Sequence, residues 1–164
     1  MKHDNNLWRD LLNNLRQQRR HIHALMQLTR EQTRVLAEAD VERLAEITMQ
    51  QAEHLDELDA IETERRQIVR QLGESVGLHA QPPTLSDCIH LAPDNVALTL
   101  KWLQQRLVQD IRNLQALNER NRALINYAAE TVNGWLAVVV SAASNQNTYH
   151  PTPAGEPVVL DTEV

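Results

Sequence analysis

Hydrophobic residues recur at intervals of three and four along three long stretches of the chain, which is the spacing of one face of an α-helix. The three stretches are residues 5–38, 41–73 and 94–143. Only Ala39 and Asp40 separate the first two, and so short a connection makes neighbouring helices antiparallel. Asp40 suits the N-cap of the second helix, and Gly73 suits its C-cap. The pattern predicts an all-α fold of three long helices, with an antiparallel hairpin over residues 5–73.

Two segments of the chain fall outside these patterns. The link over residues 74–93 contains two consecutive prolines, which cannot continue a helix, although residues 86–91 are expected to form one short helical turn. Residues 144–164 form a proline-bearing tail with too little apolar surface to order itself, so a disordered C-terminal tail is predicted. The sequence thus predicts one helical-bundle domain over residues 1–143, followed by a flexible tail.

The third helix is expected to be longer than its neighbours. At 1.5 Å per residue, two helices of roughly 33 residues are each about 50 Å long, whereas a helix of roughly 50 residues is about 75 Å long. About 20 to 25 Å of the third helix should therefore extend past the hairpin. As an alternative, the helix could break at Gly134 and fold back, since a glycine inside a helix costs about 1 kcal/mol relative to alanine.

The C-terminal part of this third helix is apolar on every side over residues 135–140. A helix that is apolar all round must be buried against something, so we expect another protein chain to cover it. Trp135, followed closely by three valines, is the best interface candidate among the three tryptophans. The predicted contact face consists of Leu124, Ile125, Ala128, Val132, Trp135, Leu136 and Val139.

Composition narrows the classes of function. The chain has 164 residues and a formal net charge of −6, which argues against general nucleic-acid binding. Its single cysteine, Cys88, rules out an internal disulfide. The N-terminus is polar, so no signal peptide is expected, and no stretch reaches the roughly 20 apolar residues that span a bilayer. We therefore expect a cytoplasmic protein that is not embedded in a membrane.

Charge is distributed unevenly between the first two helices, because arginines make the first one basic and carboxylates make the second one acidic. Opposite charges favour pairing of the two helices, although each exposed ion pair contributes only about 0.2–1 kcal/mol. This interpretation explains the basic run at residues 16–20 better than an RNA-binding patch does.

Enzymatic and metal sites are not expected. Metal sites in helical bundles use Glu-x-x-His motifs, but none of the residues three positions before His21, His23 and His54 is a glutamate. Cys88 lies near His90, yet a buried or incidental cysteine is the simpler interpretation without an activating environment. No catalytic residue, metal or cofactor is predicted.

One segment of the third helix resembles a family signature. Residues 117–125 read Leu-Asn-Glu-Arg-Asn-Arg-Ala-Leu-Ile, with a leucine–asparagine pair, a second asparagine three residues on and then two aliphatic residues. This order resembles the signature of the FlgN family, chaperones of flagellar protein export, with Asn118 and Asn121 as its asparagines. The hairpin resembles that family as well, at Glu31, Leu36, Val41, Leu44, Leu55, Leu58, Ile61, Arg65, Arg66 and Gly73. A structural alternative for the two asparagines is that they fix helix register, as in coiled coils.

The resemblance implies a cytosolic export chaperone. Such chaperones bind the C-terminal amphipathic segments of the hook–filament junction proteins, prevent their premature association and deliver them to the flagellar type III export gate. An amphipathic client helix lays its apolar face against a hydrophobic surface, so the contact face defined above becomes the predicted client-binding site. No nucleotide or cofactor is implied. Which junction protein is bound, and whether the free chaperone is a monomer or a homodimer, stay open.

Tyr149 resembles the tail tyrosine with which this family docks at the cytosolic domain of the export gate. Here His150 and Pro151 follow it, and a glycine arrives only at Gly155, whereas the family's tyrosine is often followed directly by glycine. The alternative function is structural: a coiled-coil adaptor that self-associates through the same apolar end and has no secreted client.

Overall fold

The computed structural model describes residues 2–77 and 83–146, which form four helices and no strand. The helices are α1 (Lys2–Glu38), α2 (Val41–Ser75), α3 (Leu85–Leu91) and α4 (Asp94–Gln146). The all-α class is therefore confirmed. The arrangement differs in detail from three long helices, because the expected short turn in the link is a separate seven-residue helix, α3.

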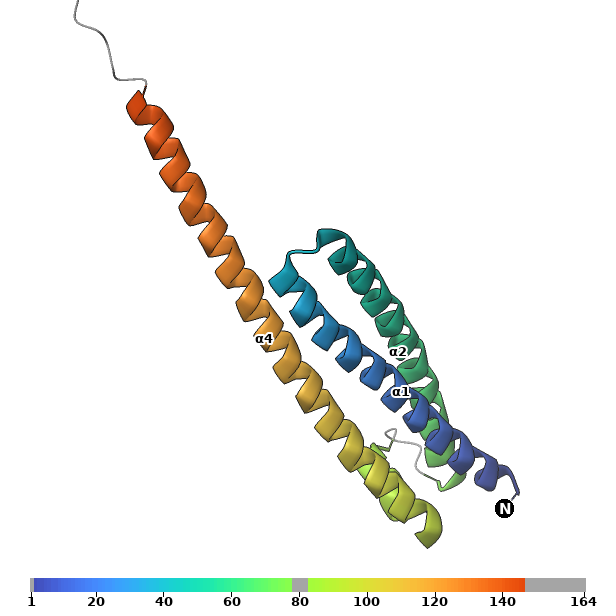
Figure 1. Ribbon diagram of the computed structural model, residues 1–164. Coiled ribbons are helices and arrows are strands. Elements are labelled where there is room, and N and C mark those ends of the chain that lie inside the picture. The colour runs from blue at the N-terminus through green and yellow to red at the C-terminus, as the bar shows by residue number, and fades with distance from the viewer. Residues whose placement is uncertain (1, 78–82, 147–164) are drawn as a thin grey trace, which may run out of the picture. The chain divides into compact units, whose positions relative to one another are not determined.

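Helices α1 and α2 lie side by side and antiparallel (Figure 1). Ala39 turns the chain between them with a φ of 56°. The carboxylate of Asp40 then accepts a 3.0 Å hydrogen bond from the backbone N–H of Arg43. Because the first N–H groups of a helix have no intrahelical partner, this bond stabilises the start of α2. The prediction that Asp40 is the N-cap is confirmed.

The C-terminal end of α2 lies beyond the predicted position. Gly73 is buried inside the helix, which continues to Ser75. The chain leaves the helix at Gly77, whose φ of 81° a residue without a Cβ atom adopts readily. Gly73 as the C-cap was therefore wrong, because it is Gly77 that takes the left-handed conformation.

Helix α3 is defined by a capping box at its first turn. The hydroxyl of Thr84 accepts a 3.2 Å hydrogen bond from the backbone N–H of Asp87, whose carboxylate accepts a 2.8 Å bond from the backbone N–H of Thr84. Cys88, in the middle of α3, is fully buried in the core. This burial raises the pKa of the Cys88 thiol, which therefore packs as a small apolar side chain rather than reacting as a nucleophile.

The hydrophobic core draws on all four helices. Its members are Leu7, Trp8, Leu11, Leu15, Ile22, Met26, Ile68, Val69, Leu72, Cys88, Leu100, Leu103 and Leu107. The three leucines of α4 are at most 6% exposed, although no Cα atom of α4 lies within 8 Å of one in α1 or α2. The first half of α4 is therefore held against the hairpin by its long side chains, each worth about 1.5–3 kcal/mol when fully buried.

Helix α4 is the longest element, with 53 residues against 37 in α1 and 35 in α2. It runs through Gly134 without interruption, so the alternative of a break at that glycine is wrong. Contacts divide the chain into two units, Met1–Ile125 and Asn126–Val164, and the boundary falls within α4. In the second unit, the structure describes only the helical residues 126–146.

Ion pairs between the helices differ from the expectation. In residues 2–77, no arginine of α1 pairs with a carboxylate of α2; instead, Arg43 of α2 pairs with Glu31 of α1 at 2.6 Å. Arg19 of α1 turns to α4, where its Nε lies 2.8 Å from Oδ2 of Asp110. Nε2 of His23 lies 2.8 Å from the same oxygen. Ion pairs thus link α1 both to α2 and to α4.

Asp110 gives the stability of the protein a defined pH dependence. Burial alone would raise the pKa of Asp110, but hydrogen bonds from Arg19 and His23 outweigh it and hold the pKa below its usual 3.8. A carboxyl group with a lower pKa in the folded state stabilises the protein above the unfolded-state pKa, and this contribution is lost as the pH falls through the folded-state pKa. We expect Asp110→Asn to lower the free energy of unfolding at neutral pH by about 1–3 kcal/mol and to flatten its acid dependence.

Urea denaturation at neutral pH and between pH 5 and 3 measures both effects. Asp59→Asn is the matched control, because this α2 side chain is exposed and its loss should change stability by less than about 0.5 kcal/mol. Equal stability of the Asp110→Asn protein and the parent across this range would show that the contact contributes nothing.

Candidate functional site

One stripe of residues runs along α4 in steps of three and four. Its members are Leu100, Leu103, Leu107, Asp110, Leu114, Leu117, Asn121, Leu124, Ala128, Val132, Trp135 and Val139. We call this stripe the α4 seam. Its members up to Asn121 are buried or half-buried, whereas every member from Leu124 onward is exposed. The α4 seam therefore has the same spacing throughout but is covered along only part of its length.

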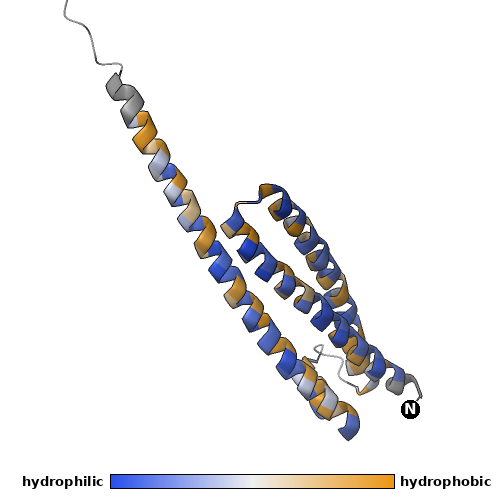
Figure 2. Cartoon of the chain, in the orientation of Figure 1, coloured by the Kyte–Doolittle hydropathy of each residue, from blue (hydrophilic) through white to orange (hydrophobic). Residues whose placement is uncertain are grey.

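The seven predicted client-binding residues all lie on the exposed part of α4. Leu124 and Ile125 end the first unit, and the other five belong to the second. At 3.6 residues per turn, the seven side chains fall within about a third of the helix circumference. Trp135 is 69% exposed and Val139 is 60% exposed, values that are unusual for large apolar side chains of an isolated soluble protein. Figure 2 shows hydrophobic residues recurring along this part of α4.

The helical part of the second unit has a polar side at its start and is apolar all round further along. Asn126, Glu130 and Asn133 give its first turns a polar side, opposite the client-binding face. Residues 135–140 are then apolar on all sides and every one of them is exposed. No lysine or arginine follows Arg122 in the sequence. This surface can therefore bind a partner by apolar contact and has little charge with which to attract one.

Asn121 is the last buried residue of the α4 seam, with 3% of its surface exposed. Its amide nitrogen donates to the carbonyl oxygen of Thr29 at 2.9 Å and to Oε1 of Gln32 at 3.0 Å. Its Oδ1 accepts a 2.6 Å hydrogen bond from the hydroxyl of Thr33. All three partners belong to α1, so a shift of α4 along α1 would leave a buried amide unpaired. This geometry supports the register role for Asn121, whereas Asn118 is exposed.

Tyr149, the predicted docking residue for the export gate, lies outside the described residues. The other tyrosine of the chain, Tyr127, is 72% exposed on α4. Docking through Tyr149 stays a prediction.

Within residues 2–77 and 83–146, no group of three or more His, Cys, Asp or Glu side chains is placed to hold a metal ion. The Nδ1 atoms of His21 and His54 are 3.1 Å apart, which is a hydrogen bond between α1 and α2.

The expectation that no stretch is apolar enough to span a bilayer needs correction. Within Asp94–Ser141, an 18-residue window reaches a mean hydropathy of 1.2, and none of it is buried. By length and composition alone, this one helix would suffice to cross a membrane. The same stretch contains Asn126, Glu130 and Asn133, which give it a polar side. The stretch is therefore apolar in composition and exposed in the structure.

Sequence reasoning missed two features of the first unit. Trp102 is 47% exposed, and the guanidinium carbons of Arg19 and Arg106 lie 5.2 and 5.6 Å from its ring centre. A groove of about 880 Å³ is lined by residues of all four helices and the chain just before α3. In the sequence, this groove is indicated only by Val108 and Ile111, two apolar residues beside the α4 seam.

A family profile described as FlgN protein matches residues 1–154 of the chain. The matched range includes every described helix and Tyr149, and it ends before residues 155–164. No curated protein and no solved structure matches the chain.

The two signature asparagines provide a matched pair of variants. We expect Asn121→Ala to lower the free energy of unfolding by about 1–3 kcal/mol, because buried partners on α1 lose their hydrogen bonds. Asn118→Ala should change it by less than about 0.5 kcal/mol, since this side chain is exposed. Thermal and urea unfolding followed by circular dichroism measure the difference, and equal stabilities would refute the register role of Asn121.

Proposed function

The chain belongs to the FlgN family of flagellar chaperones, and from this we propose that it is a cytoplasmic export chaperone for hook–filament junction proteins. It binds their C-terminal amphipathic segments, prevents their premature association and delivers them to the export gate of the flagellar type III system. The single observation that supports this function most is the exposed part of the α4 seam, in which Trp135 is the largest side chain.

Client binding follows from the chemistry of this surface. An amphipathic client helix has an apolar face that must be kept from water until assembly, and the exposed α4 seam offers an apolar face of matching spacing. Trp135 supplies the largest contact area. Leu136 follows it directly in the sequence, and Val139 lies about one helical turn further along α4. Because the surface carries no cationic side chain, the affinity must come from burial of apolar area, and salt should change it little.

The exposed face also lets a client bind without disrupting the core. The leucines that hold α4 to the hairpin lie upstream of Asn121, so client residues need displace none of them. A surface that is already helical before binding avoids part of the ordering entropy of association. The client can then be released at the gate while the chaperone stays folded.

Self-association through the same face is the alternative function, and it too would cover the apolar surface. Light scattering on a mixture with a client C-terminal segment distinguishes the two. A chaperone forms a complex containing both chains, whereas a structural adaptor gives only homo-oligomers.

The central variant combines Trp135→Ala and Leu136→Ala. Since burial of a large apolar side chain is worth about 1.5–3 kcal/mol, the double variant should weaken client binding by well over tenfold. Its helix content and unfolding temperature should stay close to those of the parent, because both side chains are more than half exposed. Calorimetric titration with the C-terminal peptide of a junction protein measures the affinity.

Met49→Ala with Leu98→Ala is the matched control, because these side chains are 66% and 73% exposed on other surfaces. This control also truncates two large exposed apolar side chains and should leave the affinity unchanged. Equal affinities of the central variant and the parent would rule out the proposed client-binding face.

Tyr149 is proposed to dock the loaded chaperone at the cytosolic domain of the export gate. An aromatic side chain in a proline-bearing segment can fill a pocket on a partner. Tyr149→Ala should leave client affinity and helix content unchanged while weakening capture by the gate domain at least tenfold, as loss of an aromatic anchor does. Tyr127→Ala is the control, because it removes the only other tyrosine and should not affect capture.

Pull-down and titration with the same Tyr149→Ala protein measure both interactions. Loss of client binding would place Tyr149 in the client site, and no change in either interaction would leave it without a role.

A further inference from the structure

One face of α2 is exposed along most of the helix and changes the sign of its charge halfway. Its residues recur at alternating steps of three and four, which is the spacing of a single helix face. They are Met49, Ala52, Asp56, Asp59, Thr63, Arg66 and Arg70, and all seven are exposed. We call this set the α2 stripe. Two carboxylates precede Thr63 and two guanidinium groups follow it, so each half of the stripe is complementary in charge to the other half.

The charged groups of the α2 stripe are accessible to a partner. Within the described part of the chain, the carboxylates of Asp56 and Asp59 take part in no ion pair or hydrogen bond. Arg66 and Arg70 each have one carboxylate neighbour on α2, at 3.0 and 3.9 Å, but their side chains are 76% and 65% exposed. Each arginine can therefore bind a second carboxylate.

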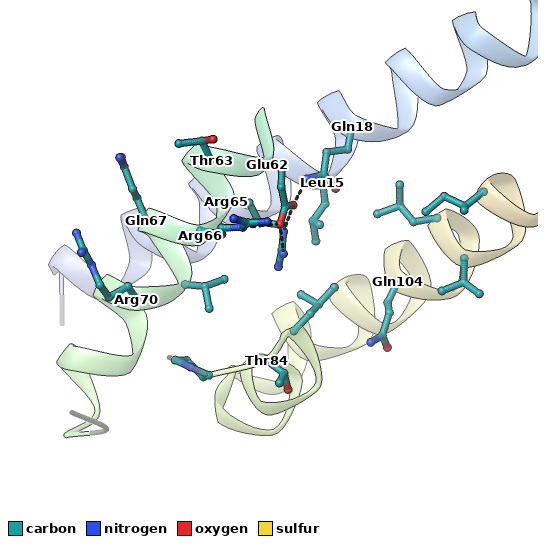
Figure 3. Close-up of a pocket in the computed structure, with 16 residues that line it drawn as sticks. Leu15, Gln18, Glu62, Thr63, Arg65, Arg66, Gln67, Arg70, Thr84 and Gln104 are labelled. Carbon is teal, nitrogen blue, oxygen red and sulfur yellow. Dashed lines mark hydrogen bonds and ion pairs between the residues drawn. The ribbon is translucent and has the colours of Figure 1, made fainter. Parts of the chain in front are cut away.

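The groove described above lies directly beside the basic half of the α2 stripe. Thr63, Arg66 and Arg70 line its α2 wall (Figure 3). Val108 and Ile111 line its α4 wall and are 43% and 42% exposed. The basic half is thus bordered by apolar surface that a partner can cover.

The acidic half of the α2 stripe has an exposed apolar side chain on the same side of the helix. Leu55 is 56% exposed. It precedes Glu62, which lines the groove, by about two helical turns, so Leu55 lies on the groove side of the stripe. Each molecule therefore presents an acidic half with an exposed leucine and a basic half with an apolar groove.

These two halves match each other when a second copy is turned around. Asp56 and Arg70 both lie seven residues from Thr63, and Asp59 and Arg66 lie four and three residues from it. Two α2 helices that run antiparallel and cross at Thr63 therefore bring each carboxylate opposite an arginine. A two-fold axis repeats every contact, so the pairing includes four ion pairs. Parallel helices in the same register would instead oppose like charges.

We propose that a second copy of this chain docks on the α2 stripe, with the two α2 helices antiparallel and crossing at Thr63. Asp56 pairs with Arg70 of the partner subunit, and Leu55 of the partner subunit enters the groove beside Arg66. The resulting two-fold dimer is closed, because the same surface is used on both copies. The contact includes no residue of the client-binding face, so it is distinct from self-association through the α4 seam.

A disulfide at the two-fold axis tests the geometry. Thr63→Cys places two thiols at the crossing point, and the full chain should form a covalent dimer under mild oxidation, because Cα atoms joined by a disulfide are about 4.4–6.8 Å apart. Thr48→Cys is the matched control, because Thr48 is also an exposed threonine of α2 whose hydroxyl donates to a carbonyl oxygen one turn earlier. In the proposed pairing the two copies of this residue are about 45 Å apart, so the control should give at least tenfold less covalent dimer. Cys88, the one native cysteine, is fully buried.

Charge reversal tests the chemistry of the contact. Asp56→Arg with Asp59→Arg makes the α2 stripe wholly basic, and Arg66→Glu with Arg70→Glu makes it wholly acidic. Each double variant should weaken dimerisation by about tenfold or more, because four attractive pairs become repulsive. An equimolar mixture of the two variants should form a heterodimer, since every opposed pair then has opposite charge. Sedimentation velocity at low ionic strength, where surface charges are least screened, measures both effects.

Two further double variants are the matched controls for charge reversal. Glu42→Arg with Glu53→Arg, and Arg16→Glu with Arg30→Glu, make the same changes in net charge at exposed positions outside the α2 stripe. Both should leave dimerisation unchanged. Circular dichroism of every variant checks that its helix content is retained.

Three results would overturn the proposal. Equal amounts of covalent dimer from Thr63→Cys and Thr48→Cys would show that the contact is not centred on Thr63. A parent protein that stays monomeric at low ionic strength would show that the α2 stripe does not bind a second copy. Dimerisation that is abolished by Trp135→Ala with Leu136→Ala, but unchanged by charge reversal, would assign self-association to the α4 seam.

Discussion

Residues of the α4 seam recur at intervals of three and four along its whole length, but only those up to Asn121 are buried or half-buried. The rest of the structure depends on this difference between the two parts of the seam. Upstream of Asn121, leucines of the α4 seam complete a core that the hairpin alone could not close. Downstream, residues of the same kind meet solvent, at 69% exposure for Trp135. Burial of apolar area stabilises any complex that covers this exposed part, which is the physical reason for proposing it as a binding surface.

Polar contacts determine where the covered part of the α4 seam ends. Apolar packing is non-directional, and a purely leucine seam would tolerate a shift of α4 along α1 by a full turn. Asn121 and Asp110 oppose such a shift, because each has partners on α1 at only one register. These two contacts thus favour one register of α4 against α1.

The parts of this fold that follow from local physics could be predicted from the sequence. The hairpin follows from a two-residue connection, and the N-cap follows from the carboxylate of Asp40. The C-cap of α2 could not be assigned, because Gly73 and Gly77 both allow a left-handed conformation and only tertiary packing selects between them. Two further features could not be predicted: the ion pair between Arg19 and α4, and the groove beside Val108. Both are formed by side chains far apart in the sequence, and hydrophobic periodicity does not reveal contacts of that kind. The exposed face was predicted from helix length; its binding of a client remains a prediction.

The fluorescence of Trp135 tests the central claim most directly. Titration of the parent and the Trp135→Phe variant with a client C-terminal segment compares the emission change with and without this one indole. If the exposed α4 seam is the client site, binding transfers Trp135 from water to an apolar contact, so the parent shows a blue shift and protection from acrylamide that the variant lacks. An identical emission change in both proteins, at a client concentration where calorimetry shows binding, would contradict the account.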